Sequence, residues 1–242
     1  MTENLEKDSL TKAQHYIPRF YLKYFENQRH LIERLDVREN MILSPKGKKG
    51  LCFEDFFYGL ETGKEDEVSQ IVEKLFKIEE DHISDYMPRI IDNLLSSSPV
   101  TFEHKYVLSR FMAMLYLRSP RLRSSLNSMI TSGLKQLKEI LSNYPEEVFE
   151  KVLKENFGNT LSSKEIEKVV KDEIVEPHYN NSMHLKMITE LKGFSNMLFG
   201  QEWLVYRNKT EIPFVTSDNP ISPEPFERKG IFGGGFMELT YH

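Results

Sequence analysis

A carboxylate stands where an apolar side chain belongs in the stretch of residues 66–95. Apolar residues recur there every three or four positions, which predicts an amphipathic helix. Because successive helical residues are about 100° apart, Glu79 falls at the centre of the apolar stripe and His82 falls just beside it. Burying an unpaired charge is costly, so Glu79 is expected to have a partner or a shifted pKa.

An arginine on a second predicted helix is the expected partner. Residues 101–119 form a very apolar run, and Arg118 shares its inward face. Because a guanidinium matches a carboxylate in two parallel hydrogen bonds, we predict a buried Glu79–Arg118 pair. Such a pair either fixes how the helices pack or belongs to a functional site. A third helix, over 180–199, places His184 on an apolar face, where a core histidine without a catalytic role is the commoner outcome.

Two short motifs near the ends of the chain add further candidate groups. The stretch QHYIPRFYLKYF, residues 14–25, places His15 just before a short predicted helix that Pro18 starts. His15 is either a side chain that hydrogen-bonds the entering backbone or a general base or metal ligand. The motif TSDNP places Asp218 after a predicted strand, as either a turn-forming residue or an acid/base group or metal ligand.

One long segment of the chain has no acidic residue. Between His104 and Lys138 there is no Asp or Glu, although the whole chain has a net charge of −5. The arginines Arg110, Arg121 and Arg123 are candidates for binding an anion, and the last two lie at a predicted helix start, which itself favours anions. The segment is either a solvated face that pairs with acids elsewhere or a contact for nucleic acid or a nucleotide.

The order of predicted elements indicates an α+β fold that is mainly α. Strands are predicted at 30–37 and 41–46, and again at 202–208 and 213–218, with helices filling the region between. We therefore expect a bundle of about six helices with a small β-sheet formed by N-terminal and C-terminal strands together.

Length and composition are those of an ordinary folded protein. The chain has 242 residues, of which 39% are hydrophobic and 29% charged. We expect a flexible leader at 1–13 and a single domain over 14–242 that is truncated at its C-terminus. A single cysteine excludes an internal disulfide and a multi-cysteine zinc site. No signal peptide and no run of about 20 apolar residues is present, so we predict a cytoplasmic protein without membrane contact.

Several motifs together resemble a known bacterial family, domain of unknown function 4238. They are QHYIPRFYLKYF, EDFFYG, VEKLFKIEE, FMAMLYLRSPRLR and FVTSDNP, and the resemblance covers residues from about 14 to 223. The first and last motifs are the most specific. The resemblance implies that the family's characteristic positions are His15, Pro18, Glu79, Arg118 and Asp218, and less surely Tyr58 and His184. It implies a further strand past the present C-terminus, and it implies no particular reaction.

The candidate residues favour a hydrolase acting on phosphodiesters or nucleotides. His15 would be a base or metal ligand, Glu79 and Asp218 would be acid/base groups or ligands of Mg²⁺ or Mn²⁺, and Arg118 would hold a phosphate. The alternative is a binding or sensing module whose polar cluster holds a small anionic ligand or is purely structural. An effector of a bacterial defence or toxin system is a third hypothesis. No P-loop, Rossmann, G-x-S-x-G or H-E-x-x-H motif decides among them.

Overall fold

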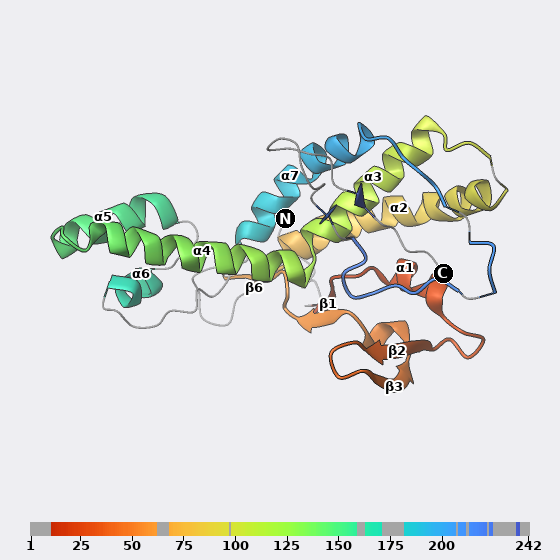
Figure 1. Ribbon diagram of the computed structural model, residues 1–242, viewed down its shortest axis with the longest axis horizontal. Helices are drawn as coiled ribbons and strands as arrows, with labels where there is room; N and C mark the ends of the chain where they lie inside the picture. The colour runs from red at the N-terminus through yellow and green to blue at the C-terminus, as the bar shows by residue number, and fades with distance from the viewer. Residues whose placement is uncertain are drawn as a thin grey trace, which may run out of the picture.

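Six helices of eight residues or more confirm the mainly helical α+β fold among the described residues. The computed structural model describes residues 11–61, 68–96, 98–158, 163–170, 182–206, 208–211, 213–221, 223–224 and 236–237. The longer helices are α2 (Ile71–Leu95), α3 (Phe102–Leu117), α4 (Pro120–Leu141), α5 (Glu146–Phe157), α6 (Ser163–Val170) and α7 (Ser182–Phe199). Figure 1 shows an elongated molecule, with a body at the right and a helical arm at the left.

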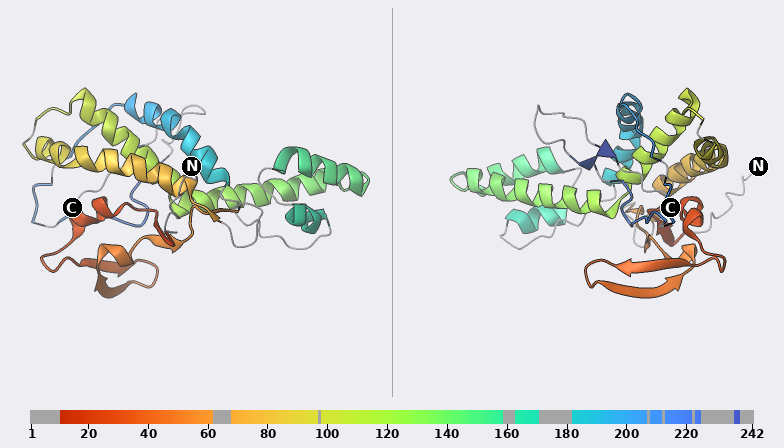
Figure 2. Two further views of the ribbon diagram at one scale, coloured as in Figure 1. Left: turned by 180° about the vertical axis from the view of Figure 1, so that it is seen from behind. Right: turned by 45° about the vertical axis from the view of Figure 1, so that its right-hand side comes forward.

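Helices α2, α3 and α7 form the helical layer of the body, and α3 packs against both of the others. The views of Figures 1 and 2 agree that the three helices lie side by side. Helix α3 is buried on nearly all sides from Val107 to Leu115, as its continuous apolar sequence predicts. The Thr101 hydroxyl caps it by accepting a hydrogen bond from the His104 backbone N–H at 3.1 Å.

Helix α2 begins later than its apolar pattern predicts. Residues Val68–Ser69 form strand β6, which pairs with β5 (Leu60–Glu61), so the helix begins at Ile71 rather than near 66. Its buried side chains are those of Val72, Phe76, Ile83, Met87 and Ile90. The predicted stripe passed through Leu75 and Tyr86, whereas the structure buries the next residues, Phe76 and Met87, so the buried stripe is rotated from the predicted one. The rotation turns His82 outward and leaves two glutamates, Glu79 and Glu80, on either side of the stripe.

The N-terminal motif forms a strand followed by a short helix. Strand β1 (Ala13–His15) pairs antiparallel with β4 (Phe53–Asp55), which sets His15 opposite Phe53. The chain then turns at Pro18 into α1 (Arg19–Leu22) and a single 3-10 turn, η1 (Lys23–Phe25), so the predicted short helix is confirmed. The rings of this motif pack in or against the core, except that of Tyr24, which is exposed. Tyr21, for example, is 1% exposed, and its ring centre lies 5.5 Å from that of Phe111 on α3.

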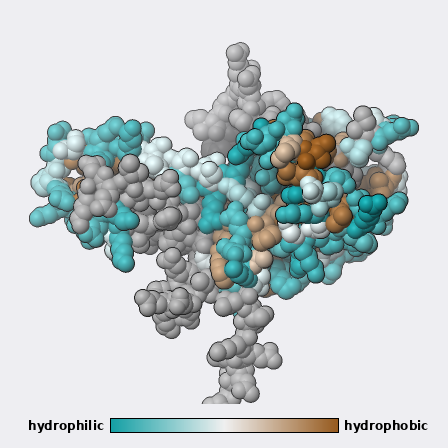
Figure 3. Space-filling view, turned by 90° about the horizontal axis from the view of Figure 1, so that it is seen from below, coloured by the Kyte–Doolittle hydropathy of each residue, from teal (hydrophilic) through white to brown (hydrophobic). Residues whose placement is uncertain are grey.

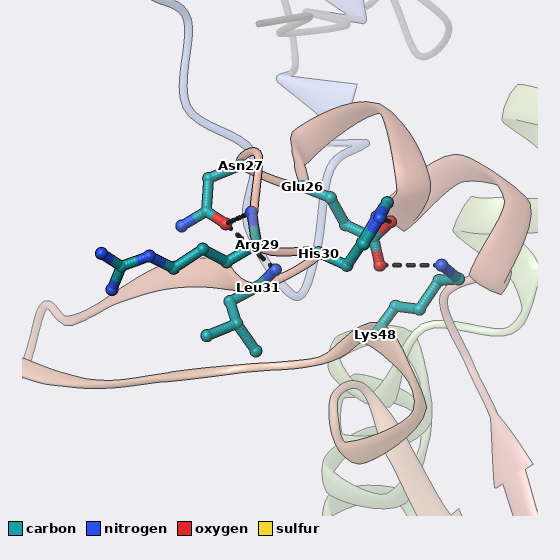
Figure 4. A network of polar contacts seen from close by, with 6 residues as sticks. All are labelled: Glu26, Asn27, Arg29, His30, Leu31 and Lys48. Carbon is teal, nitrogen blue, oxygen red and sulfur yellow. Dashed lines mark hydrogen bonds and ion pairs between the residues drawn. The ribbon is translucent and has the colours of Figure 1, made fainter.

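The predicted hairpin over 30–46 is also confirmed. Strand β2 (Ile32–Asp36) pairs antiparallel with β3 (Met41–Lys46), and Figure 2 (right) shows the hairpin apart from the helices. Its base is fixed by an ion pair in which Lys48 donates to the nearly buried Glu26 carboxylate at 2.7 Å (Figure 4). That hydrogen bond lowers the pKa of Glu26. The Asn27 side-chain oxygen, which accepts from two backbone N–H groups, shapes the turn into β2.

The predicted sheet of N-terminal and C-terminal strands together is not formed by the described residues. Each described sheet has two strands, and the only C-terminal ones are β7 (Pro223–Glu224) and β8 (Phe236–Met237), which pair with each other. The described parts of 202–208 and 213–218 contain no strand. Alternating apolar residues give an extended segment the same pattern as a strand, but a strand requires a neighbour to complete its backbone hydrogen bonds.

Two hydrophobic clusters stabilise the body and the arm. The larger one fills the body. The smaller one, in the arm, contains Ile130, Leu134, Phe149, Leu153 and Ile166. Helix α4 takes part in both, since Leu122 and Leu126 pack against the body cluster. On the face in Figure 3 hydrophilic residues dominate and brown apolar patches are small. None of the described helices is both long enough and apolar enough to span a bilayer.

Candidate functional site

Arg118 lies at the centre of a buried polar cluster. It is the C-cap residue of α3, and only 1% of it is exposed. Its Nε–H donates to the Tyr58 hydroxyl at 2.9 Å, and its two terminal nitrogens donate to the Glu80 carboxylate and to the His15 carbonyl oxygen. The guanidinium carbon also lies 4.9 Å from the ring centre of Phe76. One side chain therefore joins α3 to α2, to β1 and to the segment after β4.

Tyr58, which accepts from Arg118, is itself buried and paired. Tyr58 is fully buried, and its backbone N–H donates to the Gln14 side-chain oxygen at 2.5 Å. Burial raises the pKa of Tyr58 so that its phenol stays neutral. Burial alone lowers the pKa of Arg118, but Tyr58 and Glu80 outweigh that effect and raise it, so the guanidinium stays charged. The core of the cluster is a neutral phenol beside a permanent cation.

Two titratable atoms next to this core have hydrogen-bonding capacity left over. The Nε2 atom of His15 and the Oε2 atom of Glu73 are both buried, and neither has a hydrogen-bond partner among the described residues. Burial lowers the pKa of His15 and raises the pKa of Glu73. Both shifts disfavour the charged form of the side chain. Perturbed pKa values of this kind are concentrated at functional sites.

His15 and Glu73 are influenced by the same charged groups. Arg19, Glu80 and Arg118 each shift both pKa values, which places all five residues in one electrostatic neighbourhood. Arg19 differs from Arg118 because it is exposed at the start of α1. The name buried polar cluster is used below for His15, Tyr58, Glu73, Glu80 and Arg118, with Arg19 on its solvent side.

The predicted Glu79–Arg118 pair is wrong. Glu79 instead accepts hydrogen bonds from Arg110 on α3, one of them at 3.1 Å from Nε, while Glu80 binds Arg118. The reason is geometric, since consecutive residues on α2 point about 100° apart and the buried stripe passes between them. Arg110 is thus held in an ion pair. His82 is exposed, which contradicts its predicted inward position.

Asp218 lies near the N-terminal motif but on its outer side. It is exposed, and its charge helps raise the pKa values of Tyr16 and Cys52, in both cases after burial as the main cause. The neighbouring Thr216 hydroxyl shares a hydrogen bond of 2.9 Å with the Tyr21 hydroxyl. The TSDNP motif therefore packs on the motif that contains His15, whereas Asp218 is absent from the charges that shift His15 itself.

The other predicted anion-binding arginines have different surroundings. Arg123 covers the Phe57 ring at 4.4 Å and donates to the Phe57 carbonyl at 3.5 Å, which is a packing role. Arg121 is exposed at the start of α4, where it lines a cavity of about 200 Å³ together with Asn219 of the TSDNP motif. His184 lies in α7, and its side chain is outside the described residues.

The predicted metal ligands do not assemble. Within the described parts of the chain, no three His, Cys, Asp or Glu side chains come together in a way that could hold a metal ion. His15, Glu79 and Asp218 are therefore not gathered into one three-residue ligand set.

Sequence reasoning missed Glu73 and Glu80. They are seven residues apart, which places them on one side of α2 two turns from each other. Two carboxylates at that spacing beside an apolar stripe were a usable signal for a polar site on this helix. Gln14 was also missed. It is fully buried although it stands beside a candidate histidine.

A family model covers nearly the whole chain. The model described as a protein of unknown function, DUF4238, matches residues 13–239. The chain belongs to the DUF4238 family. The resemblance inferred from the motifs is thereby confirmed over its full length, and the buried polar cluster of this DUF4238 chain lies inside the matched region. Comparison with curated proteins and with solved structures gives no match.

Proposed function

We propose that this chain is a hydrolase that cleaves phosphate esters, with His15 and Glu73 as an acid–base pair. The observation that carries the proposal is the pair of buried, unpartnered atoms, His15 Nε2 and Glu73 Oε2, beside a permanently charged arginine. Burial disfavours the charged form of both side chains, so it lowers the pKa of His15 and raises the pKa of Glu73. These are the directions that a general base and a general acid require.

The proposed reaction needs no group beyond these side chains and water. Neutral His15 accepts a proton from a water molecule while the water oxygen forms a new bond to phosphorus. Protonated Glu73 donates its proton to the leaving oxygen as the old phosphorus–oxygen bond breaks. The products are an alcohol and a phosphate with one ester bond fewer, and solvent carries the proton from His15 back to Glu73.

The charge distribution supports a phosphate-containing substrate. Arg118 is already engaged by three acceptors, so its role is to hold the His15 backbone in place. Arg19 is an exposed cation whose charge lowers the pKa values of both His15 and Glu73. In this proposal Arg19 binds the phosphate oxygens from the solvent side and stabilises the negative charge that develops there.

Turnover on model phosphate esters tests the proposal. The purified chain is assayed with bis(p-nitrophenyl) phosphate, p-nitrophenyl phosphate, the common nucleotides and a single-stranded oligonucleotide, from pH 5 to 9. We expect turnover of at least one of them, with a bell-shaped pH profile. His15→Gln and Glu73→Gln should each lower it about 100-fold or more, as for the loss of a general acid or base.

Matched variants far from the cluster control this assay. His30 and Glu39 are exposed residues of the β2–β3 hairpin, so His30→Gln and Glu39→Gln should retain full turnover. Absence of turnover on every substrate contradicts the proposal. So does turnover that survives in His15→Gln, since it then arises elsewhere.

A non-catalytic module is the second candidate function. Its support is the complete engagement of the Arg118 guanidinium, which resembles a structural clamp more than a substrate-binding group. In that case the cluster locks α2 and α3 to β1, or holds a small anion at Arg19. Stabilisation of the chain by phosphate in thermal unfolding, abolished by Arg19→Gln and without turnover, is the outcome that favours this function.

A further inference from the structure

A second polar site lies between α2 and α3, on the other side of the buried stripe from Glu80. It is an open cavity of about 370 Å³ lined by Ile78, Glu79, His82, Tyr106 and Arg110. The hydrolase proposal uses none of these side chains. Glu79, His82 and Arg110 were all candidates in the sequence, and the structure brings them together here rather than around Arg118.

The walls of this cavity suit a flat aromatic ligand. Tyr106 is 41% exposed and Ile78 is 65% exposed, so a ring and an aliphatic side chain face solvent within one cavity. His82 adds a second exposed ring, whose centre lies 5.1 Å from that of Tyr86. Exposed rings beside an apolar side chain are the surfaces on which unpaired bases stack.

The Glu79–Arg110 ion pair supplies polar groups at the edge of the cavity. Arg110 donates to both carboxylate oxygens of Glu79, and its remaining terminal nitrogen lies 3.5 Å from the Tyr106 hydroxyl. Each carboxylate oxygen keeps a further lone pair, and the guanidinium keeps N–H groups beyond those bonds. Acceptors and donors therefore stand side by side, as the hydrogen-bonding edge of a nucleobase requires.

A further cation follows the cavity along α2. Arg89, about two turns after His82, lies 4.7 Å from the Tyr86 ring centre. On α3, Lys105 directly precedes Tyr106 but faces α7, where it donates to the Gln201 carbonyl at 2.7 Å and lies 5.3 Å from the Phe199 ring centre. Alternation of rings and cations is the pattern of surfaces that bind single-stranded nucleic acid or nucleotides.

We propose that the cavity between α2 and α3 binds a nucleobase, stacked on Tyr106 and read at its edge by Glu79 and Arg110. The base can belong to a free nucleotide or to an unpaired nucleotide of a nucleic acid strand. The inference goes beyond the proposed function, since the cavity lies on the other side of the buried stripe from Glu80 and is a separate site. Base binding itself is measurable without any turnover.

Calorimetric titration with nucleoside monophosphates tests the base contact. Ribose 5-phosphate, which has the sugar and phosphate without a base, is the negative probe. We expect at least one nucleotide to bind and ribose 5-phosphate to bind at least tenfold more weakly. Tyr106→Ala should weaken nucleotide binding about tenfold, while Tyr106→Phe should stay within about twofold because it keeps the ring. Tyr144, an exposed tyrosine on the arm, provides the control Tyr144→Ala.

A parallel arm distinguishes the two sources of the base. Fluorescence anisotropy with a labelled ten-nucleotide single strand is measured at two salt concentrations. Binding of the strand but not of mononucleotides, with affinity that falls with salt, assigns the cavity to nucleic acid. Binding of mononucleotides alone assigns it to a free nucleotide. Failure of both ligands to bind overturns the proposal, and so does binding that Tyr106→Ala leaves unchanged.

The variants separate this inference from the hydrolase proposal. His15→Gln should abolish turnover and keep nucleotide binding, whereas Tyr106→Ala should lose nucleotide binding. Binding without any turnover supports the base-binding proposal and contradicts the hydrolase proposal. Turnover without binding at the cavity, measured by calorimetry and anisotropy, supports the hydrolase and overturns the base-binding proposal. Thermal unfolding of each variant confirms that it folds, which the exposure of Tyr106 leads us to expect.

Discussion

Glu79 and Glu80 are adjacent on α2, yet they bind arginines from different turns of α3. Glu79 binds Arg110 in the middle of α3, with both side chains partly exposed, and Glu80 binds Arg118 at the end of α3, with the arginine buried. The two pairs have the same chemistry in different surroundings. They therefore offer an internal comparison of a surface ion pair with a buried one.

Replacing each arginine in turn should show how much more the buried ion pair contributes to stability than the surface one. Arg118→Met removes a buried cation and leaves the Glu80 carboxylate and the Tyr58 hydroxyl without their partner, so we expect a loss of about 3 kcal/mol or more in the free energy of unfolding. Arg110→Met should cost about 1 kcal/mol or less, because its pair is in contact with solvent. Urea denaturation of both variants measures the difference, and equal losses would show that Arg118 does not hold the cluster together.

Glu73→Gln should stabilise the chain at neutral pH. Burial raises the pKa of Glu73 in the folded state, so the fold favours the protonated carboxyl group and ionisation of Glu73 costs stability. That cost is absent below the unfolded pKa of about 4.5 and grows as the pH rises through the folded value. We expect the melting temperature of Glu73→Gln to exceed that of the natural chain at pH 7 and to match it near pH 4. A lower melting temperature at pH 7 contradicts this expectation.

Arg19→Gln should raise the pKa of His15. Burial lowers that pKa first, and the positive charge of Arg19 lowers it further, so removal of the charge relieves part of the shift. NMR titration of the imidazole signals from pH 4 to 8 measures the change. Lys12→Gln, an exposed cation paired with Asp55, is the control and should leave the His15 titration where it was.

The base of the hairpin should respond to acid. Lys48 holds the pKa of Glu26 below its ordinary value, so the pair adds stability that is present above about pH 4.5 and is lost as the pH falls through the folded value. Lys48→Met should cost about 1 kcal/mol at pH 7 and much less at pH 3. Melting curves at both pH values test this, with Lys46→Met as a control at an exposed neighbouring lysine.

Cys52 should react slowly with alkylating reagents. Burial and the charge of Asp218 raise the pKa of its thiol to about 11, so little thiolate exists at pH 8. Asp218→Asn should speed alkylation by iodoacetamide, whereas Asp85→Asn on α2, outside the groups that shift Cys52, should not. An unchanged rate in Asp218→Asn would place the TSDNP motif farther from Cys52 than the structure has it.

Local sequence patterns predicted the positions of helices well, but they predicted poorly which charged side chains pair with each other. Periodic apolar residues located α3 within one or two residues at each end, because it begins at a capping residue and ends where the apolar run ends. The inward position of Arg118 also followed from spacing. The start of α2 was missed because β6 continues the apolar pattern. The predicted stripe was rotated for a separate reason, since Phe76 and Met87 are buried in place of Leu75 and Tyr86, and this put His82 on the wrong side.

Partner choice depends on three-dimensional placement that spacing cannot supply. The helical periodicity placed Glu79 at the centre of the apolar stripe. Which of the two adjacent glutamates contacts Arg118, however, depends on how α3 crosses α2. The unpartnered atoms of His15 and Glu73 likewise appear only when β1 and α2 are packed together. The family resemblance supplied positions such as Tyr58 without their contacts.

Helix α4 is common to both hydrophobic clusters, and this has a mechanical consequence. Its 22 residues rise about 1.5 Å each, so it is a stiff rod about 33 Å long. One end of the rod is anchored directly after Arg118, and the other carries α5 and α6. A force applied to α5 or α6 would therefore act through α4, as a lever, on the segment beside Arg118.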